Sequence, residues 1–163
     1  MERWGKFIVL FLLAAGLSLF FQKPPATSNK PAGITKEAAS TEQAAVAHVI
    51  DGDSVQLSDG QELRYIGIDA PEYGMCFGKE AMEANRQLVA GKNVRLEKDV
   101  SQTDKYRRLL RYVYAGDTFV NEYLVRQGYA RASAFQPDVK FAEQFRAAET
   151  EAWENNRGLW GGC

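Results

Sequence analysis

The sequence predicts an α+β domain built on a small β-barrel, behind a separate N-terminal leader. Residues 46–68 alternate β-branched or aromatic residues with polar ones, and the hairpin-type dipeptides Asp51-Gly52 and Asp59-Gly60 divide them. Three later segments repeat apolar residues at helical spacing. Hydrophobic residues make up 45% of the 163-residue chain and charged residues 25%, enough to bury a core. This composition excludes collagen, coiled coils, disordered chains and polytopic membrane proteins.

The predicted strands account for the barrel. Residues 46–68 predict a three-stranded meander, and residues 94–96 and 109–114 predict two more strands around a polar loop at 99–107. Five short strands separated by regular turns favour a small barrel.

Three helices complete the fold. The first is predicted over residues 78–90 and the second over 118–127, and glycines at 91 and 128 end them in the C′ position. The third is predicted to start at Pro137-Asp138, with Asp138 as its N-cap. Its apolar stripe is predicted to be core and consists of Phe141, Phe145, Ala148 and Ala152.

The N-terminus has the pattern of an export signal. Arg3 and Lys6 precede the uncharged block 7–21, which is shorter than the ~20 residues of a usual membrane span. Residues 1–21 are therefore predicted to form either a signal peptide or a signal anchor. We favour the uncleaved anchor, because no small-x-small cleavage site follows directly. Residues 22–44 read as a flexible tether, and 45–163 as the folded domain. The domain is therefore expected outside the cytoplasm, membrane-anchored or secreted after cleavage.

The cysteine, charge and histidine content limits which disulfides, phosphate sites and metal sites the chain can form. The chain has two cysteines, Cys76 and Cys163, and an even count in an exported protein predicts a disulfide, with two unpaired thiols as the alternative. Residues 44–163 carry fifteen Lys/Arg against eighteen Asp/Glu, so phosphate binding needs a local basic cluster or a metal ion. The single histidine, His48, cannot build a His-rich zinc site and is predicted to be a plain strand residue.

Three separated motifs carry the chemical information. They are VIDGDS at 49–54, LRYIGIDAPE at 63–72 and TDKYRRLL at 103–110, followed by Val120-Asn121, LVRQG at 124–128 and RGLW at 157–160. In this order they resemble the staphylococcal nuclease (thermonuclease) family over residues 46–160. The resemblance implies a five-stranded OB-fold barrel with three helices. It also implies calcium-dependent hydrolysis of phosphodiester bonds in DNA and RNA, with little sugar specificity, single-stranded or frayed substrates and no obligate protein partner.

A metal site is predicted from two aspartates. Asp53 at a strand start and Asp69 at the end of a neighbouring strand can converge as hard oxygen ligands, which suit calcium or magnesium. The resemblance implies that Ca2+ is held by Asp53, Asp69 and the backbone carbonyl of Ala70, with Asp51 in the outer shell. An EF-hand loop starting at Asp51 is excluded, because its sixth position is Gln56 where the sharp turn needs glycine.

The resemblance also assigns the catalytic groups. Glu72 matches the family's general base, and Arg64 and Arg108 match the two arginines that hold the phosphate. These residue types suit the reaction, since a carboxylate can take a proton from water and a guanidinium donates two hydrogen bonds while staying charged.

Substrate contacts are predicted in a basic cluster and a downstream segment. Lys105 and Tyr106 match residues that contact a terminal phosphate in the family, and the cluster also includes Arg107, Arg108 and Arg111. Arg107 stands where the family has glycine, so a positive φ is expected there. In the segment 131–137 the family has two tyrosines that flank a bound base, and the resemblance implies that Phe135 keeps one of these stacking surfaces whereas Ser133 removes the other.

Two other functional classes remain as alternatives to the nuclease. One is a catalytically inactive OB-fold module that binds nucleic acid or protein, although such modules usually lack the base or an arginine. The other is a calcium-stabilised structural domain, which would show calcium-dependent melting without turnover.

Overall fold

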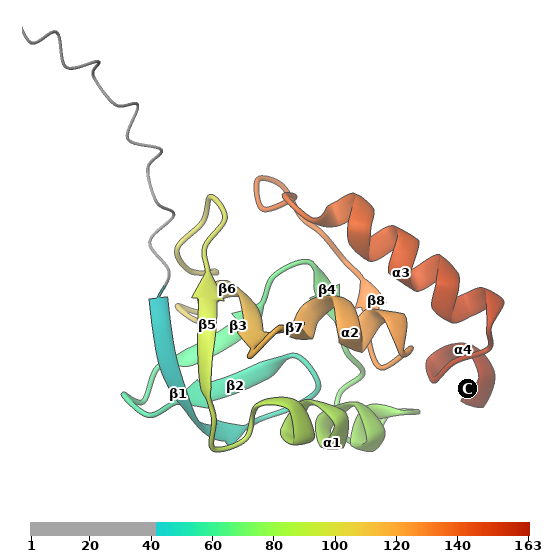
Figure 1. Ribbon diagram of the computed structural model, residues 1–163, viewed down its shortest axis with the longest axis horizontal. Helices are drawn as coiled ribbons and strands as arrows, with labels where there is room; N and C mark the ends of the chain where they lie inside the picture. Colours follow the sequence, from blue (N-terminus) through green and yellow to red (C-terminus); the bar gives the residue numbers. More distant parts are fainter. Residues whose placement is uncertain (1–41) are drawn as a thin grey trace, which may run out of the picture. The chain divides into compact units, whose positions relative to one another are not determined.

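The computed structural model describes residues 42–163, so the predicted signal segment and most of the tether lie outside the described residues (Figure 1). Within the described part of the chain, no helix has both the length and the apolar character needed to cross a membrane.

A five-stranded mixed barrel forms the centre of the domain. Its strands run in the order β3-β2-β1-β5-β6, and the parallel pairing of β3 with β6, with Leu63 opposite Leu109, closes it. The predicted barrel is therefore confirmed. The strands are β1 (Glu42–Val49), β2 (Ser54–Leu57), β3 (Glu62–Tyr65), β5 (Asn93–Glu97) and β6 (Leu109–Ala115).

Buried apolar residues alternate with more exposed ones along the strands, so apolar side chains fill the inside of the barrel. In β2, Val55 and Leu57 are buried while Gln56 between them is exposed, and β5 buries Val94 and Leu96 in the same way. His48 is an exposed residue of β1 opposite Gln56, as expected of a plain strand residue.

Three helices and a short C-terminal helix pack against the barrel and against one another (Figure 1). The first two end as predicted, because Gly91 and Gly128 have φ of 69° and 74°. On the third helix, Phe145, Ala148 and Ala152 are buried, and this helix packs mainly against the second helix. The helices are α1 (Gly78–Val89), α2 (Val120–Arg126), α3 (Ala142–Glu154) and α4 (Leu159–Gly162).

Some boundaries differ from the predicted ones. The strand β1 begins at Glu42, so residues 42–44 belong to the sheet and not to the tether. Thr118–Phe119 form the strand β7, which pairs with β6 before α2 begins. A second, two-stranded sheet joins β4 (Ile68–Asp69) to β8 (Arg131–Ala132).

The predicted role of Asp138 as an N-cap is wrong. The helix α3 begins only at Ala142, and its N-cap position is Phe141, without a side-chain cap. Instead, the Asp138 carboxylate accepts hydrogen bonds from the backbone N–H groups of Val100 and Ser101 at 2.9 and 2.7 Å. The Asp138 carboxylate therefore binds a loop that is distant in the sequence and does not cap the helix.

Asn121 ties α2 to the closed part of the barrel. Its Oδ1 accepts a hydrogen bond from the backbone N–H of Val113 in β6, and its Nδ2 donates to the carbonyl oxygen of Ile66, just after β3, both at 2.9 Å. Asn121 is fully buried. One motif residue is thus structural, because it joins the two strands whose pairing closes the barrel.

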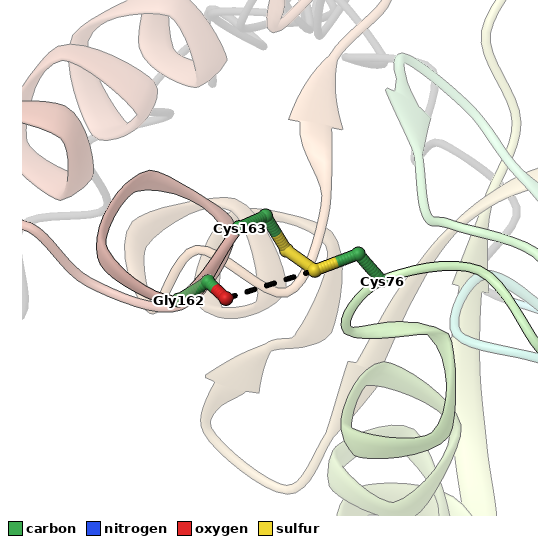
Figure 2. Close-up of a disulfide and its surroundings, with 3 residues drawn as sticks. All are labelled: Cys76, Gly162 and Cys163. Carbon is green, nitrogen blue, oxygen red and sulfur yellow. Dashed lines mark hydrogen bonds between the residues drawn. A yellow bond between two sulfur atoms is a disulfide. The ribbon is translucent and has the colours of Figure 1, made fainter.

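The predicted disulfide is present. Cys76 and Cys163 are bridged with a Cα–Cα distance of 6.0 Å (Figure 2). Cys76 lies two residues before α1, and its Sγ is 3.7 Å from the carbonyl oxygen of Gly162 in α4. The bridge therefore fastens the end of the chain to the segment that leads into the first helix.

Candidate functional site

Arg64 lies between the two aspartates predicted to bind metal. Its Nη2 is 2.8 Å from Asp69 Oδ1, and its Nη1 forms an ion pair with Asp53 Oδ2. The fold explains this convergence, since Arg64 in β3 pairs with Ser54 at the start of β2, directly after Asp53, and Asp69 ends the nearby β4. The structure thus brings three predicted site residues into direct contact.

Asp53 is the buried member of this group, with 3% of its surface exposed. Its carboxylate accepts hydrogen bonds from the backbone N–H of Ala70 at 2.6 Å and from Ser54 Oγ at 3.1 Å. Burial raises the pKa of Asp53 to about 7, although the neighbouring Arg64 charge acts in the opposite direction. Burying this carboxylate is costly unless a positive charge stays beside it.

The turn before Asp53 depends on a small residue and an aspartate. A Cβ atom at Gly52 would lie 2.5 Å from the Ala70 Cβ, so no side chain fits there. Asp51 Oδ1 accepts the backbone N–H of Asp53 at 2.9 Å, and the Asp51 carbonyl accepts Asn85 Nδ2 at 2.9 Å. Asp51 therefore shapes the turn that presents Asp53.

The donor set fits a hard divalent cation. The Asp53 and Asp69 carboxylates both contact the Arg64 guanidinium, so they are close enough to share one cation. The backbone N–H of Ala70 donates to Asp53, which fixes the Ala70 backbone beside this carboxylate. Within residues 42–163, no group of three or more His, Cys, Asp or Glu side chains gathers as a metal site. An ion held here would accordingly take its other ligands from backbone oxygen, water or substrate, as hard cations commonly do.

Both predicted phosphate-binding arginines line one pocket. This pocket of about 620 Å³ lies between the barrel and the segment after β8, and its lining includes Arg64, Arg108, Lys105, Tyr106 and Phe135. All five residues predicted to contact substrate, whether at the phosphate or at a nucleotide, therefore share one surface. Phe135 and Tyr106 are 75% and 66% exposed, so their rings are free to stack.

Asp104 holds the loop that carries Arg108. Its Oδ2 accepts Arg108 Nε at 2.7 Å, and its Oδ1 accepts the backbone N–H groups of Tyr106 and Arg108 at 2.9 and 3.0 Å. Partial burial raises the pKa of Asp104, but these hydrogen bonds outweigh it and lower the pKa overall. The expected positive φ at Arg107 is confirmed at 69°.

The basic cluster is smaller than predicted. Lys105 Nζ and Arg108 Cζ lie 4.9 and 5.5 Å from the centre of the Tyr106 ring, within cation–π range. Arg111 does not belong to this surface, because it is 3% exposed and its guanidinium donates to Glu42 Oε2 at 3.0 Å and to two backbone carbonyls. These hydrogen bonds hold the buried guanidinium of Arg111 away from the substrate surface.

Glu72 lies at a neighbouring pocket. It is exposed, and with Asp69, Ala70 and the disulfide it lines a pocket of about 460 Å³. Its loop is tightly built, since its carbonyl accepts the Met75 N–H at 2.9 Å and a Cβ at Gly78 would lie 2.0 Å from that carbonyl oxygen. Asp69 connects the two pockets, because it lines this one while binding Arg64, which lines the other.

The segment 131–137 carries one exposed aromatic ring. Ser133 is half-buried, and its backbone N–H donates to the Gly67 carbonyl at 2.8 Å, while Phe135 projects into solvent. Sequence reasoning missed Asp104, although an acidic residue four positions before Arg108 was a usable signal. It also missed Asn85, which bonds the Asp51 carbonyl and the Tyr65 hydroxyl, and no local pattern indicated this role.

Comparisons with known proteins agree on one family. The family model described as "Staphylococcal nuclease homologue" matches residues 62–162. The chain is 35% identical over 140 residues to a thermonuclease of Staphylococcus hyicus, covering 80% of this chain and 82% of that protein. It is 36% identical over 124 residues to a thermonuclease of Staphylococcus intermedius, covering 71% and 74% of the two chains. It is also 36% identical over 122 residues to endonuclease YncB of Bacillus subtilis, covering 68% and 58%.

The residues matched by the family model include all the predicted catalytic, substrate-binding and metal-site residues except Asp51 and Asp53, which lie before residue 62 and adjoin the same barrel strands. The family match, the relatives named as nucleases and the mixed barrel agree with one another. This chain belongs to the staphylococcal nuclease family, and its biochemical class is that of a nuclease.

Proposed function

We propose that the protein is a calcium-dependent nuclease that hydrolyses phosphodiester bonds in DNA and RNA with little sugar specificity. One observation carries the proposal: Arg64 contacts both Asp53 and Asp69 and lines the same pocket as Arg108. This arrangement concentrates two guanidinium groups beside two carboxylates at one point of the surface. Hydrolysis of a phosphodiester needs such a combination of charge neutralisation and metal binding.

Each residue has a distinct role in the proposed reaction. Asp53, Asp69 and the Ala70 carbonyl would hold Ca2+, which would supply polarisation of the phosphate and of an adjacent water. Glu72 accepts the proton of the attacking water as general base. Arg64 and Arg108 hold the phosphate oxygens through paired N–H donors and offset the negative charge that develops on them.

The proposed substrate is single-stranded or frayed nucleic acid. A terminal phosphate is assigned to Lys105 and Tyr106, and a base to the exposed ring of Phe135. The disulfide supports export, because such bridges persist in oxidising compartments. We therefore place the domain outside the cytoplasm, either anchored to the membrane by residues 1–21 or secreted after their removal.

Digestion of single-stranded DNA and RNA by the purified protein tests the proposal. Cleavage is expected with Ca2+ and is expected to stop with chelator. Glu72→Gln, Arg64→Gln and Arg108→Gln are each expected to lose on the order of 10³-fold in rate, by analogy with removing a preorganised charge donor. Glu154→Gln is a matched control, because Glu154 is an exposed carboxylate at the end of α3.

The alternatives give different results. An inactive binding module would retain single-stranded DNA without cutting it, and a calcium-stabilised structural domain would melt at higher temperature with Ca2+ without binding DNA. Cleavage by Glu72→Gln at the wild-type rate would overturn the assignment of the base.

A further inference from the structure

The proposed function leaves one cation beside Glu72 without a role. Arg131 in β8 lines the same pocket of about 460 Å³ as Glu72 and Asp69, and among the described residues it is the only basic one in that lining. The side chain of Arg131 is exposed. A pocket with two carboxylates would repel a phosphodiester, and Arg131 offsets that repulsion.

The sheet register fixes where Arg131 stands. Arg131 is directly opposite Asp69 in the antiparallel pairing of β8 with β4, so their side chains leave the same face of the sheet. Asp69 is already engaged by Arg64 at 2.8 Å. Arg64, which lines the pocket of Arg108, therefore contacts Asp69, while Arg131, which lines the pocket of Glu72, is paired with Asp69 across the sheet.

The guanidinium of Arg131 remains available to a ligand. Within residues 42–163 it makes no hydrogen bond and no ion pair, whereas Arg64, Arg108 and Arg111 each have a carboxylate partner. Its Cζ lies 5.0 Å from the centre of the Trp160 ring. The cation–π contact steadies the group and uses none of its N–H groups as donors to oxygen.

We propose that Arg131 binds the phosphate of the nucleotide next to the scissile one, on the Glu72 side of the site. This inference rests on the proposed function. The substrate strand then runs from the pocket of Arg108 and Phe135, past Asp69, into the pocket of Glu72. Arg131 is a binding and positioning residue for strands that extend beyond the cleaved bond, and it does not contact the reacting atoms.

Substrate length separates this role from others. Arg131→Gln, Arg131→Lys and wild type are compared on single-stranded oligonucleotides and on a minimal nucleoside phosphodiester with a nitrophenyl leaving group, which has no flanking phosphate. Arg131→Gln is expected to raise KM about tenfold for the oligonucleotides with kcat unchanged, and to leave the minimal substrate unaffected. Arg131→Lys is expected to recover most of the loss. Arg86→Gln is the control, since Arg86 is an exposed arginine on α1 that lines neither pocket.

Two results would overturn the inference. One is an unchanged oligonucleotide KM for Arg131→Gln, and the other is an equal loss on the minimal and the extended substrates. Binding gives a readout that does not need turnover: in the Glu72→Gln background, fluorescence anisotropy with single-stranded DNA is expected to show a salt dependence shallower by about one unit when Arg131 is replaced by Gln. Should the wild-type protein fail to cleave any nucleic acid, the proposed function fails, and an unchanged salt slope then counts separately against Arg131.

Discussion

Replacing Asp104 tests whether the loop around Arg108 is positioned by a single carboxylate. Asp104 accepts two backbone N–H groups and Arg108 Nε, and a net ~1 kcal/mol for each hydrogen bond gives an upper value of about 3 kcal/mol. The Arg108 and Asp104 side chains are 28% and 17% exposed, so water replaces part of the loss. We therefore expect Asp104→Ala to lower the free energy of unfolding by about 2 kcal/mol.

Activity should fall as well, because Arg108 loses the group that orients it. We expect kcat/KM on single-stranded DNA to drop about tenfold to a hundredfold in Asp104→Ala, less than for removal of Arg108 itself. Asp104→Asn keeps an oxygen for the backbone N–H groups and should lose activity with a smaller loss of stability. Asp59→Ala is the matched control, since Asp59 Oδ1 accepts one backbone N–H, that of Gln61, in an exposed turn that lines neither pocket. Wild-type activity in fully folded Asp104→Ala would refute the reasoning.

Three further predictions concern stability and substrate affinity. Replacing Cys76 and Cys163 together by Ser should lower the free energy of unfolding by about 4 kcal/mol, because the disulfide no longer restricts the unfolded chain over a sequence separation of 87 residues. An unchanged midpoint of urea unfolding would contradict this. In chelator, Asp53 has a pKa of about 7 against 3.8 unfolded, so stability should decline as pH rises between these values, and Asp53→Asn should abolish that decline in urea titrations. Phe135→Ala should raise KM for DNA by about tenfold with kcat unchanged, and a drop in kcat alone would exclude stacking.

Local patterns predicted the parts of the fold that local chemistry decides. Gly91 and Gly128 end their helices with positive φ, because only a residue without a Cβ adopts that conformation at low cost. Asp138 was misassigned, because its partners Val100 and Ser101 are far away in the sequence. A capping signal is local, so it could not reveal that competition. Arg111 was misplaced for a related reason, since its burial depends on the carboxylate of Glu42.

The family motifs predicted more of the site than the chemistry of the individual residues did. Spacing alone suggested that Asp53 and Asp69 converge, and the contact of both with Arg64 agrees with it. The separation of Glu72 from Arg108 into adjoining pockets could not be predicted, because it depends on how the loop after β4 is fastened by the disulfide and by Gly78. The disulfide joins residues separated by 87 positions, so no local pattern indicates how it holds this loop.

The amide of Asn121 imposes an unusual restriction on its position. Val113 needs an acceptor and Ile66 needs a donor, and the two requirements meet at one fully enclosed side chain. A carboxylate offers no donor and an aliphatic group offers neither, whereas glutamine has the chemistry but is one methylene too long for a packed interior. Asparagine therefore meets both requirements with one planar amide, although it lies outside the pockets where substrate is proposed to bind.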